Sequence, residues 1–198
     1  MLNAPNIPLL HDHATAHWHN PTSPLQAATA PLDKLILEQH RANFDLWHTE
    51  DQARAPQVTG EAMIAIKHSI DRLNQHRNDL VERIDVTLLE AAPNQSPTAP
   101  LHSETPGLMI DRLSILALKI FHTAEETQRP NASSQHHQRN RDRLELLTAQ
   151  RSDLATCLAI LWAEVLADTR RFKLYRQLKM YNDPTLNPVL YAKSTENR

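Results

Sequence analysis

The sequence predicts an all-α protein: a bundle of four main helices with a proline-rich N-terminal leader and an ordered C-terminal tail. Three observations indicate this fold. Apolar residues recur every three or four positions along four long segments, which is the periodicity of a helix with one buried face. Prolines cluster between those segments, and no segment alternates like a β-strand. The 198-residue chain contains only 2 glycines, which disfavours tight β-hairpins.

Residues 1–30 form the predicted leader, in which four prolines and several Asn, Thr and Ser residues interrupt any periodicity. We expect this segment to be flexible or to lie loosely on the surface. It contains two histidine pairs, His11-Asp12-His13 and His17-Trp18-His19. Imidazole binds transition metals, but a segment without rigid structure does not define a coordination geometry. We therefore interpret these histidines as sites of adventitious binding.

The first two helices are predicted at residues 32–54 and 60–90. Pro56 follows the first helix and ends it. The second helix has an inward stripe of aliphatic residues, which are Ile66, Ile70, Leu73, Leu80, Ile84 and Leu88. The next stretch, residues 91–103, contains three prolines and is expected to be a crossover loop.

The third and fourth helices are predicted at residues 106–126 and from about 137 to 167, with an extension as far as 175. The third is apolar on nearly every side, as in a helix that others enclose. The fourth carries leucines at intervals of three and four that form a seam for packing. Residues 182–191, with two prolines and several apolar side chains, are expected to be an ordered tail that covers apolar surface. Residues 31–198 would then form a single helical domain.

Composition excludes several function classes. A net charge of -2 provides no general attraction to nucleic acid or to anionic membranes. Neither a P-loop nor a Gly-x-Gly-x-x-Gly pattern occurs, which excludes the nucleotide enzymes that depend on them. The single cysteine, Cys157, excludes an intrachain disulfide and a zinc site with several thiolates. No apolar run approaches the ~20 residues that span a bilayer, and no secretory leader is evident, so we expect a cytoplasmic protein.

Polar side chains occupy helix positions where apolar residues are expected. Asp111 and Arg112 lie within the apolar third helix, while Arg77 and Arg151 interrupt the apolar stripes of the second and fourth. Ionised groups in such places are costly unless they pair or bind a ligand. We therefore predict one interior ligand-binding cluster, whose members are Glu50, Asp51, Arg54, Lys67, Asp71, Asn74, Arg77, Asn78, Asp111, Arg112, Ser114, Lys119, His122 and Arg151.

Two interpretations of this cluster stay open. One is an ion-pair lattice that fixes the register of the helices. The other is a polar cavity for a small anionic or polyhydroxy ligand, in which arginine supplies planar sets of donors. No cofactor and no metal site is predicted, and the sequence specifies no reaction, so whether the protein is an enzyme also stays open. The leucine seam and the tail would equally suit a homo-oligomer.

Several long motifs carry a family resemblance. They are Leu46-Trp47 with Glu50-Asp51, Ile70-Asp71-Arg72-Leu73-Asn74 with Arg77-Asn78-Asp79, Glu104-Thr105-Pro106-Gly107, and the segment 175–191. Together they resemble a bacterial family of uncharacterised all-helical proteins, a domain of unknown function, over residues 32–191. Genes of that family often lie near glycosyltransferases for surface polysaccharide. The resemblance thus implies an accessory role in glycan synthesis, with a glycosyltransferase or a small ligand as partner, and supplies no catalytic residue.

Two enzyme classes are alternatives. Glu82 and Asp85 resemble the Glu-x-x-Asp element of metal-dependent all-α nucleotide pyrophosphohydrolases, although the companion Glu-Glu-x-x-Glu element is missing. Residues 70–85 resemble the first helix of mutase-like helical enzymes such as chorismate mutases, in which Arg and Lys clamp a dicarboxylate. The basic, aromatic stretch at residues 170–176 is interpreted as a docked helix end and not as an RNA-binding surface.

Overall fold

The computed structural model describes residues 2–23, 28 and 30–176. A short 3-10 helix, η1 (Ala4–Asn6), precedes five α-helices. These are α1 (Ile7–His19), α2 (Pro31–Ala53), α3 (Gly60–Ala91), α4 (Pro106–Thr127) and α5 (Ser134–Leu166). The described residues contain no strand, apart from one isolated bridge between Leu101 and Arg171. The all-helical prediction is confirmed, and four of these helices lie at the four predicted segments.

Two parts of the predicted architecture differ from the structure. The predicted number of helices was wrong, because α1 is a fifth helix. The extension of the last helix toward residue 175 was also wrong, because α5 ends at Leu166. The predicted tail at residues 182–191 lies outside the described residues. None of the described helices is long and apolar enough to cross a lipid bilayer.

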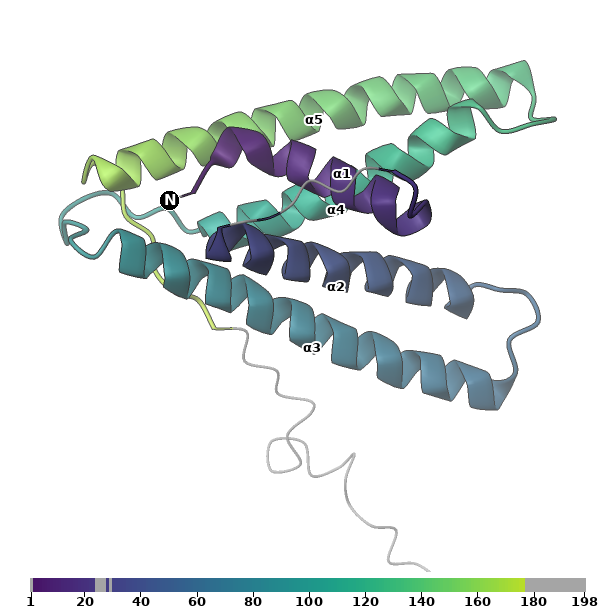
Figure 1. Ribbon diagram of the computed structural model, residues 1–198, viewed down its shortest axis with the longest axis horizontal. Helices are drawn as coiled ribbons and strands as arrows, with labels where there is room; N and C mark the ends of the chain where they lie inside the picture. Colours follow the sequence, from purple (N-terminus) through teal and green to yellow (C-terminus); the bar gives the residue numbers. More distant parts are fainter. Residues whose placement is uncertain (1, 24–27, 29, 177–198) are drawn as a thin grey trace, which may run out of the picture.

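The helices form two antiparallel pairs with α1 packed between them (Figure 1). One pair consists of α4 and α5, and the other consists of α2 and α3. The two pairs meet at one end and diverge toward the other (Figure 1). Where they meet, fully buried aliphatic side chains from four helices form the core: Ile36, Leu80, Ile84, Ile110, Leu113 and Leu158. Burial of each such side chain stabilises the fold by about 1.5–3 kcal/mol.

The first half of α3 does not belong to this core. Residues 60–79 include no buried side chain, and the buried positions of α3 begin at Leu80. The predicted inward stripe is therefore correct only from Leu80 onward. Ile66, Ile70 and Leu73 are less buried because this part of α3 lies in the diverging arm, where α2 is its main neighbour.

The prediction of a flexible leader was wrong for residues 4–19. Pro5 and Pro8 lie at the starts of η1 and α1, in first-turn positions where a helix requires no backbone N–H. These prolines therefore begin helices instead of interrupting them. One face of α1 then buries Ile7, Leu10 and Ala14, which anchors the segment on α4 and α2.

Hydroxyl side chains begin three of the long helices. Thr59, Thr105 and Ser133 accept hydrogen bonds from backbone N–H groups in the first turns of α3, α4 and α5.

The start of α4 also packs closely on α3. A Cβ atom at Gly107 would lie 2.7 Å from the carbonyl oxygen of Val81, so only glycine fits there without displacement.

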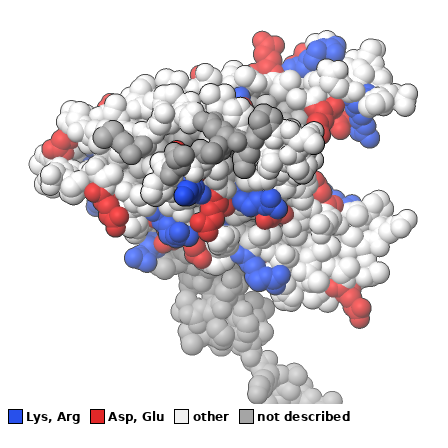
Figure 2. All heavy atoms as spheres, in the orientation of Figure 1, with Lys and Arg blue, Asp and Glu red and all other residues white. Residues whose placement is uncertain are grey.

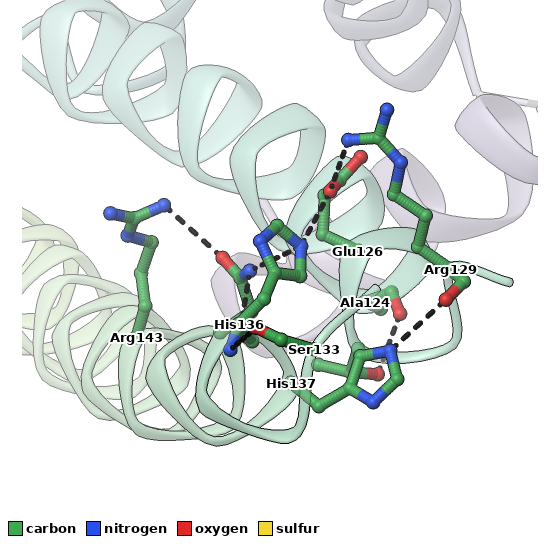
Figure 3. A network of polar contacts seen from close by, with 9 residues as sticks. Ala124, Glu126, Arg129, Ser133, His136, His137 and Arg143 are labelled. Atoms are coloured by element: carbon green, nitrogen blue, oxygen red, sulfur yellow. Dashed lines mark hydrogen bonds and ion pairs between the residues drawn. The ribbon is translucent and has the colours of Figure 1, made fainter. Parts of the chain in front are cut away.

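A polar network holds the turn between α4 and α5 (Figure 3). Glu126 near the end of α4 accepts hydrogen bonds from Arg129 (3.2 Å) and from His136 Nε2 (2.8 Å). His137 Nε2 donates to the carbonyl oxygen of Arg129 at 3.0 Å. In the first turns of α5, Arg143 donates to the amide oxygen of Asn140. The contacts of His136 and His137 with Glu126 and Arg129 fix the start of α5 against the end of α4.

Candidate functional site

Asp111 on α4 is the centre of a buried polar network. Its side chain is only 6% exposed. Oδ1 accepts hydrogen bonds from Gln39 Nε2 (2.6 Å) and Asn43 Nδ2 (2.9 Å) on α2, and from Arg77 Nε (2.7 Å) on α3. Arg77 Nη2 donates to Oδ2, which completes a two-pronged ion pair. The hydrogen bonds to Asp111 raise the pKa of the Arg77 guanidinium, so Arg77 stays charged in a network that joins three helices.

The network continues from Asn43 to α1. Asn43 Nδ2 also donates to Ser114 Oγ (2.9 Å), and Ser114 Oγ lies 2.7 Å from His40 Nδ1. His40 Nε2 lies 2.8 Å from Thr15 Oγ1 and 3.1 Å from the carbonyl oxygen of His11. Because that carbonyl only accepts, Nε2 carries the ring proton and Nδ1 accepts from Ser114. Burial lowers the pKa of His40 to about 3, which keeps this ring neutral.

A cavity of about 430 Å³ opens directly beside this network, between α2, α3 and α4; we call it the α2–α3–α4 cavity. It lies between elements of the two diverging arms, and Figure 2 shows the surface recessed between those arms. Its lining comprises Asn43, Leu46, Trp47, Glu50, Asp51, Arg54, Arg77, Ile115 and Leu118. At the exposed end of α2, Arg54 donates to Glu50 (3.1 Å) and to Asp51 (3.4 Å).

The structure brings together only part of the predicted cluster. Glu50, Asp51, Arg54 and Arg77 line the α2–α3–α4 cavity, and Asp111 pairs with Arg77. Ser114 joins the same network through Asn43, as described above. For these residues, ligand binding stays a proposal.

The prediction that Arg112, Lys119 and Arg151 converge on the same interior site was wrong. Arg112 follows Asp111 directly, and consecutive helical residues point about 100° apart, so their side chains reach different sides of α4. Arg112 and Lys119 line a separate cavity of about 710 Å³ between α4 and α5, where Arg112 pairs with Glu104 (2.6 Å). Arg151 forms an ion pair with Asp12 of α1 at 2.6 Å.

The remaining predicted residues of α3 lie outside the shielded region. Lys67 and Asp71 form an exposed pair at 4.0 Å, where solvent screens their attraction. Asn74 and Asn78 are half-buried farther along the same helix. All four lie within residues 60–79 of α3, which include no buried side chain, so their shared three-to-four spacing does not correspond to an enclosed face.

Three histidines from three helices meet next to the cavity. His19 ends α1, His48 lies on α2 and His122 lies on α4, and one nitrogen of each lies within 4.8 Å of the others. Trp47, which lines the cavity, stacks on His122 with ring centroids 5.1 Å apart. Burial, followed by the charges of His19 and His122, lowers the pKa of His48. The cluster therefore shares one wall with the α2–α3–α4 cavity.

A comparison with protein families agrees with the resemblance seen in the sequence. A family model described as a protein of unknown function (DUF4254) matches residues 33–174. The chain belongs to the DUF4254 family. The matched residues of this DUF4254 protein include Asn43, Arg77, Asp111 and the whole lining of the cavity, whereas α1 precedes them. No curated protein and no solved structure matches the chain.

Sequence reasoning missed several residues of this DUF4254 site. Gln39 had a signal, because Leu32, Ile36, Gln39 and Asn43 follow one three-to-four stripe along α2. His40 continues a second stripe from Ile36 to Phe44, and all three side chains are buried. His19 and His48 had no comparable signal, because only the tertiary packing of α1, α2 and α4 brings them to His122.

One carboxylate of the pyrophosphohydrolase-like element, Asp85, has a structural use in this DUF4254 protein. Asp85 is buried and accepts hydrogen bonds from the Thr105 hydroxyl (2.5 Å) and the Gly107 N–H (2.7 Å) at the start of α4. Burial raises the pKa of Asp85 to about 6. Both carboxylate oxygens are therefore engaged by the α4 N-terminus, which argues against Asp85 as a magnesium ligand.

Proposed function

We propose that this protein binds a small polyhydroxy ligand of the carbohydrate class in the α2–α3–α4 cavity. The observation that carries the proposal is the combination, around one cavity, of the Trp47 indole with paired carboxylate and guanidinium groups. A volume of about 430 Å³ suits a small molecule. The family resemblance supports the same ligand class, as part of an accessory role in bacterial surface-polysaccharide synthesis beside a glycosyltransferase.

The balance of charge favours a polyhydroxy ligand over a strongly anionic one. Two carboxylates, Glu50 and Asp51, line the cavity together with two arginines, Arg54 and Arg77. Both arginines are already paired with carboxylates, so the cavity has no excess of positive charge. Hydroxyl groups donate to carboxylates and accept from guanidinium groups, so sugar hydroxyls match this mixed set. The same pairing argues against a mutase site, which needs cations free to clamp a dicarboxylate.

Hydrogen bonds hold two side chains of the cavity wall in place. Asn43 is fixed by its hydrogen bonds to Asp111 and Ser114, and Arg77 by its double contact with Asp111. Arg77 uses Nε and Nη2 in that pair, which leaves Nη1 as a donor toward a ligand. A wall held in place in this way reduces the entropy lost on binding. Trp47 adds an apolar ring face against which the C–H groups of a sugar can pack.

Thermal-shift measurements with a panel of neutral sugars, sugar phosphates and nucleotide sugars test the proposal. Occupancy at a concentration of 100 Kd should raise Tm by roughly 5–10 °C for a domain of this size. Trp47→Ala should abolish the shift. Arg112→Ala is the matched control, because Arg112 lines the other cavity of α4. The proposal fails if no member of the panel raises Tm, or if the shift survives Trp47→Ala and disappears with Arg112→Ala.

A further inference from the structure

The three-histidine cluster holds nitrogen atoms that have lost contact with water without gaining a partner. The Nε2 atoms of His19, His48 and His122 are each shielded from solvent, and none of them hydrogen-bonds to another described residue. Buried polar atoms are nearly always paired, so each such atom requires an explanation. Here the three atoms belong to histidines from three different helices, and one ring nitrogen of each histidine lies within 4.8 Å of the others.

The hydrogen bonds on the other side of two rings determine what those Nε2 atoms offer. His19 Nδ1 donates to the carbonyl oxygen of Thr15 at 2.8 Å, because a carbonyl only accepts. His122 Nδ1 lies 2.9 Å from Glu125 Oε2 and donates to that carboxylate. In a neutral imidazole with the proton on Nδ1, Nε2 presents a lone pair. The Nε2 atom of each ring therefore offers an electron pair, and a carboxylate or carbonyl behind each ring is the usual support of a metal-binding histidine.

The ring positions match the geometry of a tetrahedral metal site. The centroids lie 5.1 Å apart for His19 and His48, 5.1 Å for His19 and His122, and 5.6 Å for His48 and His122. A metal held at about 2.0–2.1 Å from each Nε2 at tetrahedral angles separates the ring centroids by about 5 Å. The ligand nitrogens, all within 4.8 Å of one another, then need only small rotations of the rings to close on the ion.

Aromatic neighbours hold these rings in place. His122 stacks on Trp47 with ring planes 10° from parallel, and His19 stacks on Phe121 with planes 19° from parallel. His48 packs edge-on against Phe44, with centroids 4.5 Å apart. A set of ligands that is held before the ion arrives binds it more tightly than a mobile set.

We propose that His19, His48 and His122 bind one divalent transition-metal ion of the zinc class through their Nε2 atoms. Three neutral imidazoles suit Zn²⁺ and its neighbours Co²⁺, Ni²⁺ and Cu²⁺, whereas Mg²⁺ and Ca²⁺ require oxygen ligands. Three protein ligands leave a fourth tetrahedral position for a solvent or ligand oxygen. His48 and His122 lie within the family match and His19 precedes it, so the ion would fasten α1 to the family domain.

The metal proposal goes beyond the carbohydrate proposal and does not depend on it. The two sites share the Trp47 wall but no ligating group, since none of the three histidines lines the α2–α3–α4 cavity. Sugar binding is measured by thermal shift on Trp47→Ala, and metal binding by titration on histidine variants. Either proposal can therefore fail while the other stands.

Titration of the untagged, chelator-treated full chain with Zn²⁺ by calorimetry tests the site. We expect one ion per chain, and at least a 100-fold loss of affinity in His48→Gln and in His122→Gln. Glu125→Gln should weaken binding by about 10- to 100-fold, because it removes the carboxylate behind His122. His76→Gln is the matched control, because His76 is an exposed histidine on α3. This variant should bind Zn²⁺ with the same affinity as the unaltered chain.

Three results would overturn the assignment. In the first, the unaltered chain takes up no Zn²⁺. In the second, His48→Gln and His76→Gln bind Zn²⁺ equally well, which would mean adventitious binding elsewhere. The third result would come from titration with Co²⁺, which does not require a folded histidine variant. The unaltered chain should develop the intense visible bands of tetrahedral Co²⁺, and the pale spectrum of octahedral Co²⁺ would contradict the proposed geometry.

Discussion

Trp47 lies flat against His122, with ring centroids 5.1 Å apart and ring planes 10° from parallel. The two residues come from α2 and α4, and each belongs to a different feature of the molecule. Trp47 lines the α2–α3–α4 cavity, and His122 belongs to the three-histidine cluster. A change at one ring is therefore transmitted to the other by direct contact. Below both features, the network around Asp111 fixes the relative positions of α2, α3 and α4.

The Asp111 network makes a large contribution to stability. Asp111→Ala would leave Gln39, Asn43 and Arg77 with unpaired donors, including a half-buried guanidinium. We expect a loss of about 3–5 kcal/mol in the free energy of unfolding, measured with urea. Lys67→Ala is the control, because its exposed pair with Asp71 should contribute less than about 1 kcal/mol. Equal stability of the two variants would contradict the role assigned to Asp111.

Asp85 should make stability fall as pH rises. Its pKa is about 6 in the folded protein against an ordinary value of 3.8, so between these values the folded state binds more protons than the unfolded state. Stability is therefore lost as pH rises through this window, by at most about 3 kcal/mol. The measurement is the free energy of unfolding of the unaltered chain minus that of Asp85→Asn, taken from pH 4 to pH 7. This difference should decrease with pH, and a constant or increasing difference would refute the prediction.

The two glycines should respond oppositely to alanine. At Gly107, a new Cβ would lie 2.7 Å from the Val81 carbonyl oxygen and equally close to Asp85 Oδ1. The backbone atom cannot rotate away, so we expect Gly107→Ala to lower the free energy of unfolding by about 1–3 kcal/mol. At Gly60, a Cβ would meet nothing within 4 Å, and Gly60→Ala should stabilise the protein by about 0.4–1 kcal/mol. Urea unfolding of both variants gives the comparison, in which similar losses would be inconsistent with the packing of α4 on α3.

Metal binding should slow hydrogen exchange in α1. His19 is the last residue of α1, and its partners His48 and His122 lie on the family domain, so an ion that joins them restrains the end of α1. We expect Zn²⁺ to increase the protection of backbone amides near the C-terminus of α1, measured by mass spectrometry. The same measurement on His48→Gln should show no increase. If Zn²⁺ leaves the protection of these amides unchanged in the unaltered chain, His19 of α1 does not bind the ion.

Much of the helical architecture was predictable, because long amphipathic segments carry the signal in their own periodicity. The same local signal failed for α1. There, prolines that start helices were interpreted as breaks, although Ile7, Leu10 and Ala14 follow helical spacing. It also placed Lys67 and Asp71 correctly on one face of α3 without indicating that this face is exposed. Whether a face is buried depends on which helix covers it, and the divergence of the two helix pairs is a tertiary property.

The candidate site was only partly predictable from the sequence. An ionised group inside an apolar helix requires a partner, and this argument identified Asp111 and Arg77 from different helices. It wrongly grouped Arg112 with Asp111, although one step along a helix turns a side chain by about 100° and Arg112 lines the other cavity, between α4 and α5. The meeting of His19, His48 and His122 depends on contacts between segments far apart in the chain. No local pattern records such contacts.

Binding of a carbohydrate against Trp47 in the α2–α3–α4 cavity can be measured at the indole N–H of that residue. The chain has three tryptophans, so its three indole N–H signals can be followed separately by ¹⁵N-edited NMR during titration with the sugar panel. We predict that a binding sugar shifts the Trp47 indole signal strongly and leaves that of the buried Trp162 in place. Carbohydrate binding in this cavity would be contradicted if no sugar of the panel shifts the Trp47 signal. It would also be contradicted if the sugars shift only the signals of residues in the α4–α5 cavity, such as Arg112 and Lys119.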